Sequence, residues 1–495
     1  MNIVPKPVSV EYSDGVFYLS SNTRVVTNNT PNFFKDYLCS QCEALSGIKP
    51  CGQGNKANEI VLILDESIPS KITDESYELT VTSVSITMRA AQPAGLFYGI
   101  QSFLQLLTNN VKAERNSVQI ECLVIKDSPV FVWRGMHLDV SRHFFSVNDI
   151  KRYIDILALH KINRFHWHLT DDQGWRIEIK QYPLLTNIGS NRVENEGSLY
   201  GGYYSQEEIA EVVAYASDRF ITIVPEIEMP GHAQAALAAY PELVCTKKDV
   251  NVWNEWGISE HVYCAGNDDV FSFLQNVLDE IVSLFPGEYI HIGGDECPKE
   301  AWKSCELCQK RIEELHLENE NQLQSYFIKR IAAFLNSRKK LVIGWDEIAE
   351  GGLEKNAIVM VWQGMDKARE ALRQGNKVIM CPTSHCYFDY SQAEENEPKA
   401  FNAQLALESV YDFDPLSPVD GLINSELVLG GQGNIWTEYI SDFKHLQYMA
   451  LPRMSAMAEV LWTGEKNKDF SSFAMRLKQL TKLFDKLGIN YRPLD

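Results

Sequence analysis

The chain has 495 residues, 45% of them hydrophobic, and a formal net charge of -20 at pH 7. This composition is typical of a large globular protein with an ample apolar core. The negative charge argues against binding nucleic acid or an anionic membrane through bulk electrostatics, so an uncharged small molecule is the easier partner. No apolar stretch approaches the roughly 20 residues of a membrane span. The segment from Met1 to Lys6 lacks a signal-peptide core, so we expect a cytoplasmic protein as the sequence stands, and a secreted or periplasmic one if a signal peptide was removed.

The first 125 or so residues have the pattern of a mixed α+β region. Strand-like segments lie at 59–64, 77–81 and 84–88, and a helix is predicted over 93–107, where Leu96, Ile100, Phe103, Leu104 and Leu107 recur at helical spacing. The polar stretch Lys126–Pro129 that follows is typical of a turn or loop. We expect a smaller α+β domain over residues 1–127 and a second domain over 128–495.

Beyond residue 128 the pattern becomes regular. An apolar strand is followed by a polar or aromatic cluster and then by a helical segment, and some of these helices have start signals, such as Ser146 and Ser205 followed three residues later by an acidic residue. Eight such units predict an α/β fold with a closed C-terminal (β/α)8 TIM barrel. The strand candidates are 133–141, 162–170, 220–228, 288–294, 340–346, 357–362, 377–382 and 428–436.

The run from His291 to Glu296 is the most informative feature of the chain. Two adjacent carboxylates, Asp295 and Glu296, follow an apolar segment and two glycines. If the strand continues to this point, its alternating side chains bring the two carboxylates to a common site from different directions. Two carboxyls in one pocket repel, which separates their pKa values and allows one to act as an acid and the other as an anion.

The other predicted strand ends carry carboxylates, one arginine and several tryptophans. Chemistry in a parallel barrel is expected at these ends. Carboxylates and arginine hydrogen-bond sugar hydroxyls, and tryptophan covers the apolar face of a pyranose. No phosphate loop, dinucleotide fingerprint or Ser/His/Asp elbow accompanies them. The residues are Arg142, Asp171, Asp172, Glu228, His232, Trp345, Asp346, Glu347, Trp362, Tyr387, Asp389, Trp436 and Glu438.

The 11 cysteines are odd in number and scattered, which favours reduced thiols. One group, Cys297, Cys305 and Cys308, lies close together in sequence. Three sulfurs without a paired fourth ligand are a weak zinc signal. Ordinary thiols or a local disulfide are the favoured interpretation of this group.

Eight segments in order resemble glycoside hydrolase family 20, the β-N-acetylhexosaminidases. Together they span nearly all of the second domain, and the α+β segment before them is also what this family commonly carries. The matching segments are HLDVSRHF at 137–144, HWHLTDDQGW at 166–175, VPEIEMPGH at 224–232, GGDE at 293–296, GWDE at 344–347, WQG at 362–364, YFD at 387–389 and GNIWTE at 433–438.

The resemblance implies substrate-assisted catalysis, with three catalytic residues. Glu296 protonates the leaving oxygen and later deprotonates water, while the sugar's own 2-acetamido oxygen attacks the anomeric carbon and forms an oxazolinium ion. Asp295 holds the acetamido N–H and offsets its positive charge, and Tyr387 hydrogen-bonds the acetamido carbonyl. An intramolecular nucleophile has a large effective molarity, and fixed charge acts strongly in a dry pocket.

Binding roles follow by the same comparison. Arg142 would hold the 3- and 4-hydroxyls, and Asp389 and Glu438 the 4- and 6-hydroxyls. Asp171 and His232 would orient the Glu296 acid, although Asp172 is an alternative to Asp171. Trp345, Trp362 and Trp436 would form the pocket walls. Glu228 stands where many relatives have Asp, and it is given no role.

The expected partner is a glycan with a terminal β-linked N-acetylhexosamine, and the expected chemistry uses no metal and no cofactor. Two alternatives remain: release of a disaccharide, as by a lacto-N-biosidase, and a catalytically silent sugar-binding protein. The presence of Arg142, Asp389 and Glu438 argues for a closed pocket for one sugar. The natural aglycone, the preference between GlcNAc and GalNAc, and the oligomeric state stay open at this point.

Overall fold

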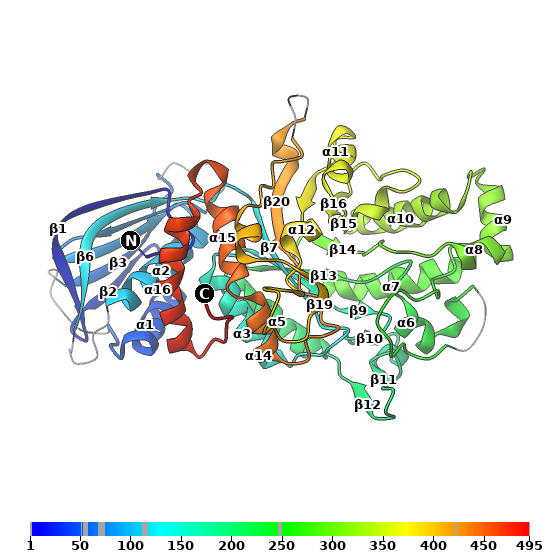
Figure 1. The fold of residues 1–495 in the computed structure, drawn as a ribbon, viewed down its shortest axis with the longest axis horizontal. Helices are drawn as coiled ribbons and strands as arrows, with labels where there is room; N and C mark the ends of the chain where they lie inside the picture. Colours follow the sequence, from blue (N-terminus) through cyan, green and yellow to red (C-terminus); the bar gives the residue numbers. More distant parts are fainter. Residues whose placement is uncertain are drawn as a thin grey trace.

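The computed structural model describes residues 2–494 except 51, 53–57, 68–74, 111–116, 246–249, 420 and 422. A mixed sheet with two helices forms one end of the molecule, and a closed barrel with its surrounding helices forms the rest (Figure 1). The expected α/β class, with a barrel preceded by a smaller α+β part, is confirmed.

The N-terminal sheet has six strands in the order β1-β6-β4-β5-β3-β2. The strands expected at 59–64, 77–81 and 84–88 are present, as is the helix expected at 93–107. Both helices of this part lie on the sheet or on each other, and they bury apolar faces there. The elements are β1 (Ser9–Ser20), β2 (Arg24–Asn28), α1 (Asn32–Ser46), β3 (Glu59–Leu64), β4 (Tyr77–Val81), β5 (Ser85–Ala90), α2 (Pro93–Asn110) and β6 (Ser117–Asp127).

The barrel closes in the order β7-β8-β13-β14-β15-β16-β17-β20, and every neighbouring pair is parallel. All eight predicted strands are present, several of them shorter than expected. Their residues are almost all buried, because helices cover the outside and side chains fill the inside. The strands are β7 (Trp133–Asp139), β8 (Arg164–His168), β13 (Thr222–Glu226), β14 (Tyr289–His291), β15 (Leu341–Trp345), β16 (Ile358–Val361), β17 (Val378–Met380) and β20 (Val428–Gly433).

The barrel helices begin where the sequence predicts. Ser146 and Ser205 each form a capping box, in which the side chain accepts an N–H of the first turn and an acidic side chain accepts the N–H of the cap residue. Asn267 caps the helix that begins at Asp268 through its side chain. The main helices are α3 (Val147–Leu159), α5 (Gln206–Ser217), α7 (Asp268–Leu284), α10 (Glu320–Ser337), α11 (Met365–Arg373), α14 (Phe443–Ala450), α15 (Arg453–Thr463) and α16 (Phe470–Leu487).

Shorter elements occupy the connections between strands and helices. They are α4 (Leu184–Asn187), α6 (Gln234–Ala239), α8 (Glu300–Ser304), α9 (Glu306–Glu314), α12 (Thr383–Cys386), α13 (Leu407–Tyr411), the 3-10 turns η1 (Pro241–Leu243), η2 (Asp346–Ala349), η3 (Ser425–Leu427) and η4 (Glu465–Asn467), and the two-stranded pairs β9 (Thr170–Asp171) with β10 (Gly174–Trp175), β11 (Asn191–Val193) with β12 (Leu199–Gly201), and β18 (Tyr390–Ser391) with β19 (Phe401–Gln404).

The sheet and the barrel meet through buried polar contacts as well as apolar packing. Asp127, at the end of β6, accepts the indole N–H of Trp462 at 2.9 Å and lies 3.1 Å from Nζ of Lys161. Helix α16 packs against α2, so the C-terminal helix bridges the two parts (Figure 1). Among the described residues, no helix is long and apolar enough to cross a membrane.

Candidate active site

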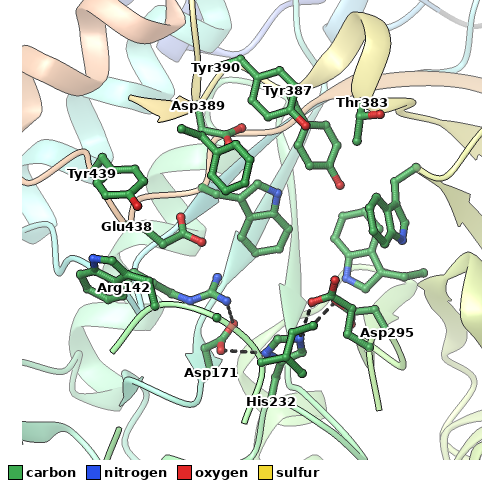
Figure 2. Close-up of a pocket in the computed structure, with 18 residues that line it drawn as sticks. Arg142, Asp171, His232, Asp295, Thr383, Tyr387, Asp389, Tyr390, Glu438 and Tyr439 are labelled. Carbon is green, nitrogen blue, oxygen red and sulfur yellow. Dashed lines mark hydrogen bonds and ion pairs between the residues drawn. The ribbon is translucent and has the colours of Figure 1, made fainter. Parts of the chain in front are cut away.

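A cavity of about 380 Å³ opens at the carboxyl ends of the barrel strands. All eleven residues with a catalytic or binding role predicted from the sequence line it. Figure 2 shows Arg142, Asp389 and Glu438 on one side of this cavity and Asp295 on the opposite side. The eleven are Arg142, Asp171, His232, Asp295, Glu296, Trp345, Trp362, Tyr387, Asp389, Trp436 and Glu438.

The structure presents the two adjacent carboxylates in a different way from the one expected. Strand β14 ends at His291, and the chain then turns through positive φ angles at Gly293 (66°), Gly294 (95°) and Glu296 (43°). A side chain at Gly293 would collide with Glu228, since an added Cβ would lie 1.7 Å from Oε2 of that residue. The prediction of a strand over 288–294 with alternating side chains is therefore wrong at its end. A strained turn presents both carboxylates to one cavity.

His232 lies between these two carboxylates and Asp171. Its Nε2 is 3.4 Å from Oε2 of Glu296 and 3.6 Å from Oδ2 of Asp295, while its Nδ1 is hydrogen-bonded to Oδ1 of Asp171 at 3.1 Å. Burial disfavours the charged imidazole, but Asp171, Asp172 and Asp295 together outweigh burial and raise the pKa of His232 well above its usual value. The histidine is thus held as a cation beside the proposed acid.

Asp171 and Asp172 both contact His232, but only Asp171 lines the cavity. Although burial opposes its ionisation, Arg142 and His232 hold the pKa of Asp171 well below the usual range. Asp172 instead accepts the backbone N–H of Gln234 at 2.9 Å. The geometry therefore favours Asp171 for the pair with His232 and gives Asp172 an anchoring contact to the loop.

Glu226 lies fully buried beneath the cavity, and sequence reasoning gave it no role. Nδ1 of His291 and Nε2 of His166 are 2.7 Å and 2.9 Å from its carboxylate, and His168 contacts the same carboxylate. The indole N–H of Trp345 donates to Oε1 of Glu226 at 2.8 Å. This network orients one cavity wall from below. His166 and His168, at alternate positions of β8, were the sequence feature that could have indicated this buried network.

Burial also controls the acidity of Asp295. It raises the pKa of this carboxyl to about 7, with His232 opposing the shift and Glu226 adding to it. Oδ1 of Asp295 is buried and finds no hydrogen-bond partner among the described residues. A buried oxygen of this kind needs a donor, and a ligand in the cavity is placed to supply one.

Aromatic side chains form the walls of the cavity. The ring of Trp362 is nearly parallel to that of Tyr387, with centroids 6.3 Å apart and an interplanar angle of 29°. The indole N–H of Trp362 donates to Glu347 at 3.0 Å, which fixes its orientation. Trp345 and Trp436 lie 5.9 Å apart at 45°. Flat apolar surfaces on several sides suit the ring and methyl group of an acetylated sugar.

Three ionisable groups, Arg142, Asp389 and Glu438, occupy the other side of the cavity. Nε of Arg142 donates to Gln173 at 2.8 Å, and its guanidinium lies 5.2 Å above the ring of Trp436. Burial, followed by repulsion from Glu438, raises the pKa of Asp389 well above its usual value. Oδ1 of Asp389 is buried without a partner among the described residues. These groups are arranged to hydrogen-bond hydroxyl groups.

Within the part of the chain that the structure describes, seven further residues line the cavity and were not predicted. Most of them are aromatic or apolar and lie on loops or short elements, where the sequence shows neither strand periodicity nor a charged cluster. They are Trp256, Gly257, Ile258, Thr383, Tyr390, Phe401 and Tyr439.

Comparisons with known proteins agree with this geometry. The model of the glycosyl hydrolase family 20 catalytic domain matches residues 131–465, and that of glycosyl hydrolase family 20 domain 2 matches residues 1–128. A β-hexosaminidase of Porphyromonas gingivalis is 44% identical over 99% of this chain, which spans 64% of that relative's length.

Solved structures show the same architecture. An exo-β-N-acetylglucosaminidase of Vibrio harveyi in complex with N-acetylglucosamine superposes with a TM-score of 0.89 at 33% identity, covering 99% of this chain and 78% of that one. A β-N-acetylhexosaminidase of Bacteroides fragilis superposes with a TM-score of 0.86 at 33% identity, covering 99% of this chain and 97% of that one. The chain belongs to glycosyl hydrolase family 20.

Proposed function

We propose that the protein is an exo-acting, retaining β-N-acetylhexosaminidase that releases terminal β-linked GlcNAc or GalNAc by substrate-assisted catalysis. The single observation that carries this proposal is the joint placement of Asp295, Glu296 and Tyr387 around one sugar-sized cavity. Family membership supports the same conclusion.

Glu296 is the general acid and base. Its side chain is 34% exposed, so it reaches the cavity from the side where the aglycone leaves and water enters. It protonates the glycosidic oxygen in the first step and removes a proton from water in the second. The cationic His232 beside it favours the carboxylate that remains after proton transfer.

The substrate's own acetamido oxygen is the nucleophile. Asp295 accepts a hydrogen bond from the acetamido N–H and stabilises the positive charge that develops as the oxazolinium ring closes. Its Oδ1 supports this role, because this buried oxygen has no hydrogen-bond partner among the described residues and a bound substrate would supply a donor. The Tyr387 hydroxyl hydrogen-bonds the acetamido carbonyl and aims it at the anomeric carbon.

The opposite side of the cavity binds the hydroxyl groups of a single sugar. Arg142 holds the 3- and 4-hydroxyls, and Asp389 and Glu438 hold the 4- and 6-hydroxyls. Arg142 and Asp389 are only 5% and 6% exposed, which leaves little room beyond the non-reducing end. This supports release of one sugar rather than of a disaccharide.

The remaining residues position these groups. Asp171 and His232 orient Glu296, while Trp345, Trp362 and Trp436 pack around the acetamido group and the ring. We further propose a boundary between two domains near residue 128, over 1–127 and 128–495. This boundary is supported by the end of the mixed sheet at Asp127 and the start of the barrel at Trp133.

A release assay over defined glycans tests the proposal. Each glycan carries a terminal β-GlcNAc, a terminal β-GalNAc, or the same sugar capped by a further residue. The proposal expects release of the monosaccharide from the uncapped glycans alone. Release of a disaccharide from capped glycans, or no release from any of them, would refute it.

A further inference from the structure

Four cysteines from two different barrel loops meet outside the cavity. The sulfur of Cys264 lies 3.6 Å from that of Cys305 and 3.7 Å from that of Cys308, and Cys308 lies 3.8 Å from Cys245. All four sulfurs lie within 4.8 Å of one another. Cys297, which the sequence groups with Cys305 and Cys308, is not a member. Its place is taken by Cys245 and Cys264, which lie about 40 to 60 residues earlier in the chain than Cys305 and Cys308.

Three of the six sulfur–sulfur distances, 3.6, 3.7 and 3.8 Å, match those of a tetrahedral metal site, and the other three do not exceed 4.8 Å. Zinc binds thiolates at about 2.3 Å, which places the sulfurs of a regular tetrahedron about 3.8 Å apart. A disulfide needs about 2.05 Å and joins sulfurs in exclusive pairs. Here Cys264 and Cys308 each contact two other sulfurs at nearly equal distances. The four sulfurs therefore surround one common point and do not form two separate pairs.

The backbone around the cluster is built for this close approach. Cys305 is the N-cap residue of α9 and Cys308 lies in its first turn, in a Cys-x-x-Cys spacing. Gly266, two residues after Cys264, lies directly on that turn: an added Cβ would be 2.2 Å from the carbonyl oxygen of Leu307 and 2.4 Å from the nitrogen of Cys308. Only glycine brings the two segments this close. Cys264 and Cys308 are only 2% and 0% exposed, so water has little access to these two sulfurs.

We propose that Cys245, Cys264, Cys305 and Cys308 bind one structural zinc ion as a tetrathiolate. Four protein ligands leave no open coordination position, so the ion serves stability and takes no part in the reaction.

The proposed zinc site would connect the two loops that carry the catalytic machinery. Cys245 and Cys264 belong to the connection after β13, which also holds His232, whereas Cys305 and Cys308 follow β14 and the two catalytic carboxylates. Tyr263 donates its backbone N–H to Pro230 at 3.0 Å and accepts the indole N–H of Trp302 at 2.9 Å. The ion thus stabilises the relative position of the loops bearing His232 and Glu296.

Metal analysis of the wild-type protein is the first test. The protein is produced without a polyhistidine tag, desalted, and analysed by inductively coupled plasma mass spectrometry. One zinc per chain is expected, with all 11 thiols titratable after denaturation in a chelator. Protein in which cobalt replaces zinc is expected to show the visible absorption of tetrahedral cobalt thiolate. Iron in place of zinc, or four fewer thiols without metal, would overturn the proposal.

Variants then assign the ligands. Cys264→Ser and Cys308→Ser are expected to lose the zinc and to lower Tm by roughly 5 °C or more. Cys122→Ser, at a buried cysteine of β6 outside the cluster, is the matched control and keeps its zinc. Full zinc content in both cluster variants would also overturn the proposal. If those variants fold poorly, metal content and cobalt absorption of the wild-type protein still decide the question.

Discussion

Arg142 and Asp171 form a buried ion pair, with Nη2 of the arginine 2.9 Å from Oδ2 of the aspartate. The second oxygen of the same carboxylate, Oδ1, is hydrogen-bonded to Nδ1 of His232. One carboxylate therefore contacts both the arginine proposed to bind hydroxyl groups and the histidine that faces Glu296. Asp171 therefore connects the proposed sugar-binding arginine to the histidine proposed to orient the acid.

We expect Asp171→Asn to raise KM and to lower kcat. Hydrogen bonds to charged groups are worth roughly 1.5–3 kcal/mol, so loss of one corresponds to roughly a 10- to 150-fold effect. Asp172→Asn is the matched comparison, because Asp172 also contacts His232 but holds the backbone N–H of Gln234 and does not line the cavity. Asp172→Asn should lower Tm and leave kcat and KM close to those of the wild-type protein. A larger kinetic loss in Asp172→Asn would reverse the assignment.

Glu296→Gln removes the proton donor while keeping the shape of the side chain. General acid catalysis typically contributes about 10²–10⁴-fold. We expect a loss of this size on glycans, whose leaving groups need protonation, and a smaller loss on activated aryl glycosides. Steady-state kinetics on both substrate types measure the difference. Equal losses on both would contradict the role of Glu296 as the acid.

Asp295→Asn and Tyr387→Phe should each lower kcat by about 10²–10³-fold, with a smaller change in KM. Both groups are proposed to interact most strongly with the charged transition state. Thr383, which also lines the cavity, provides a comparison: Thr383→Val removes a hydroxyl that has no proposed role in the chemistry. A change in KM alone for Asp295→Asn and Tyr387→Phe would show that they only bind substrate.

Burial gives Asp295 a specific pH dependence. Because its pKa is raised to about 7 in the folded protein, against about 3.9 in an unfolded chain, the protonated form is favoured by folding. Its contribution to stability is therefore fully present below about pH 4 and is lost as pH rises to about 7. Activity has the opposite trend, since the reaction needs the anion, and kcat/KM should fall as pH drops below about 7.

Asp295→Asn isolates this effect. Thermal unfolding of the variant and of the wild-type protein should give similar Tm values near pH 4, while above pH 7 the variant should be relatively more stable, since it carries no buried charge at this position. A Tm difference that is independent of pH would contradict the proposed burial of a titrating carboxyl at Asp295.

The barrel was predictable because its strands are buried on both faces and therefore appear as apolar runs, each ending in a polar cluster. The same rule gave a longer list of residues at strand ends, and the family resemblance selected from it the eleven that line the cavity. The conformation of the turn before Glu296 did not, since positive φ angles at Gly293 and Glu296 reflect tertiary contacts such as that with Glu228. The Glu226 network and the cysteine cluster depend on contacts between distant segments, which local patterns do not encode.

The acetamido oxygen of the substrate is the proposed nucleophile. Aryl β-N-acylglucosaminides whose acyl methyl group carries zero to three fluorine atoms test this role, since fluorine withdraws electrons from the attacking oxygen. We expect kcat to fall steeply with each fluorine, an aryl β-glucoside to react slower by orders of magnitude, and a thiazoline analogue of the cyclic ion to inhibit strongly. Rates that do not change across the acyl series, together with comparable β-glucosidase activity, would contradict it.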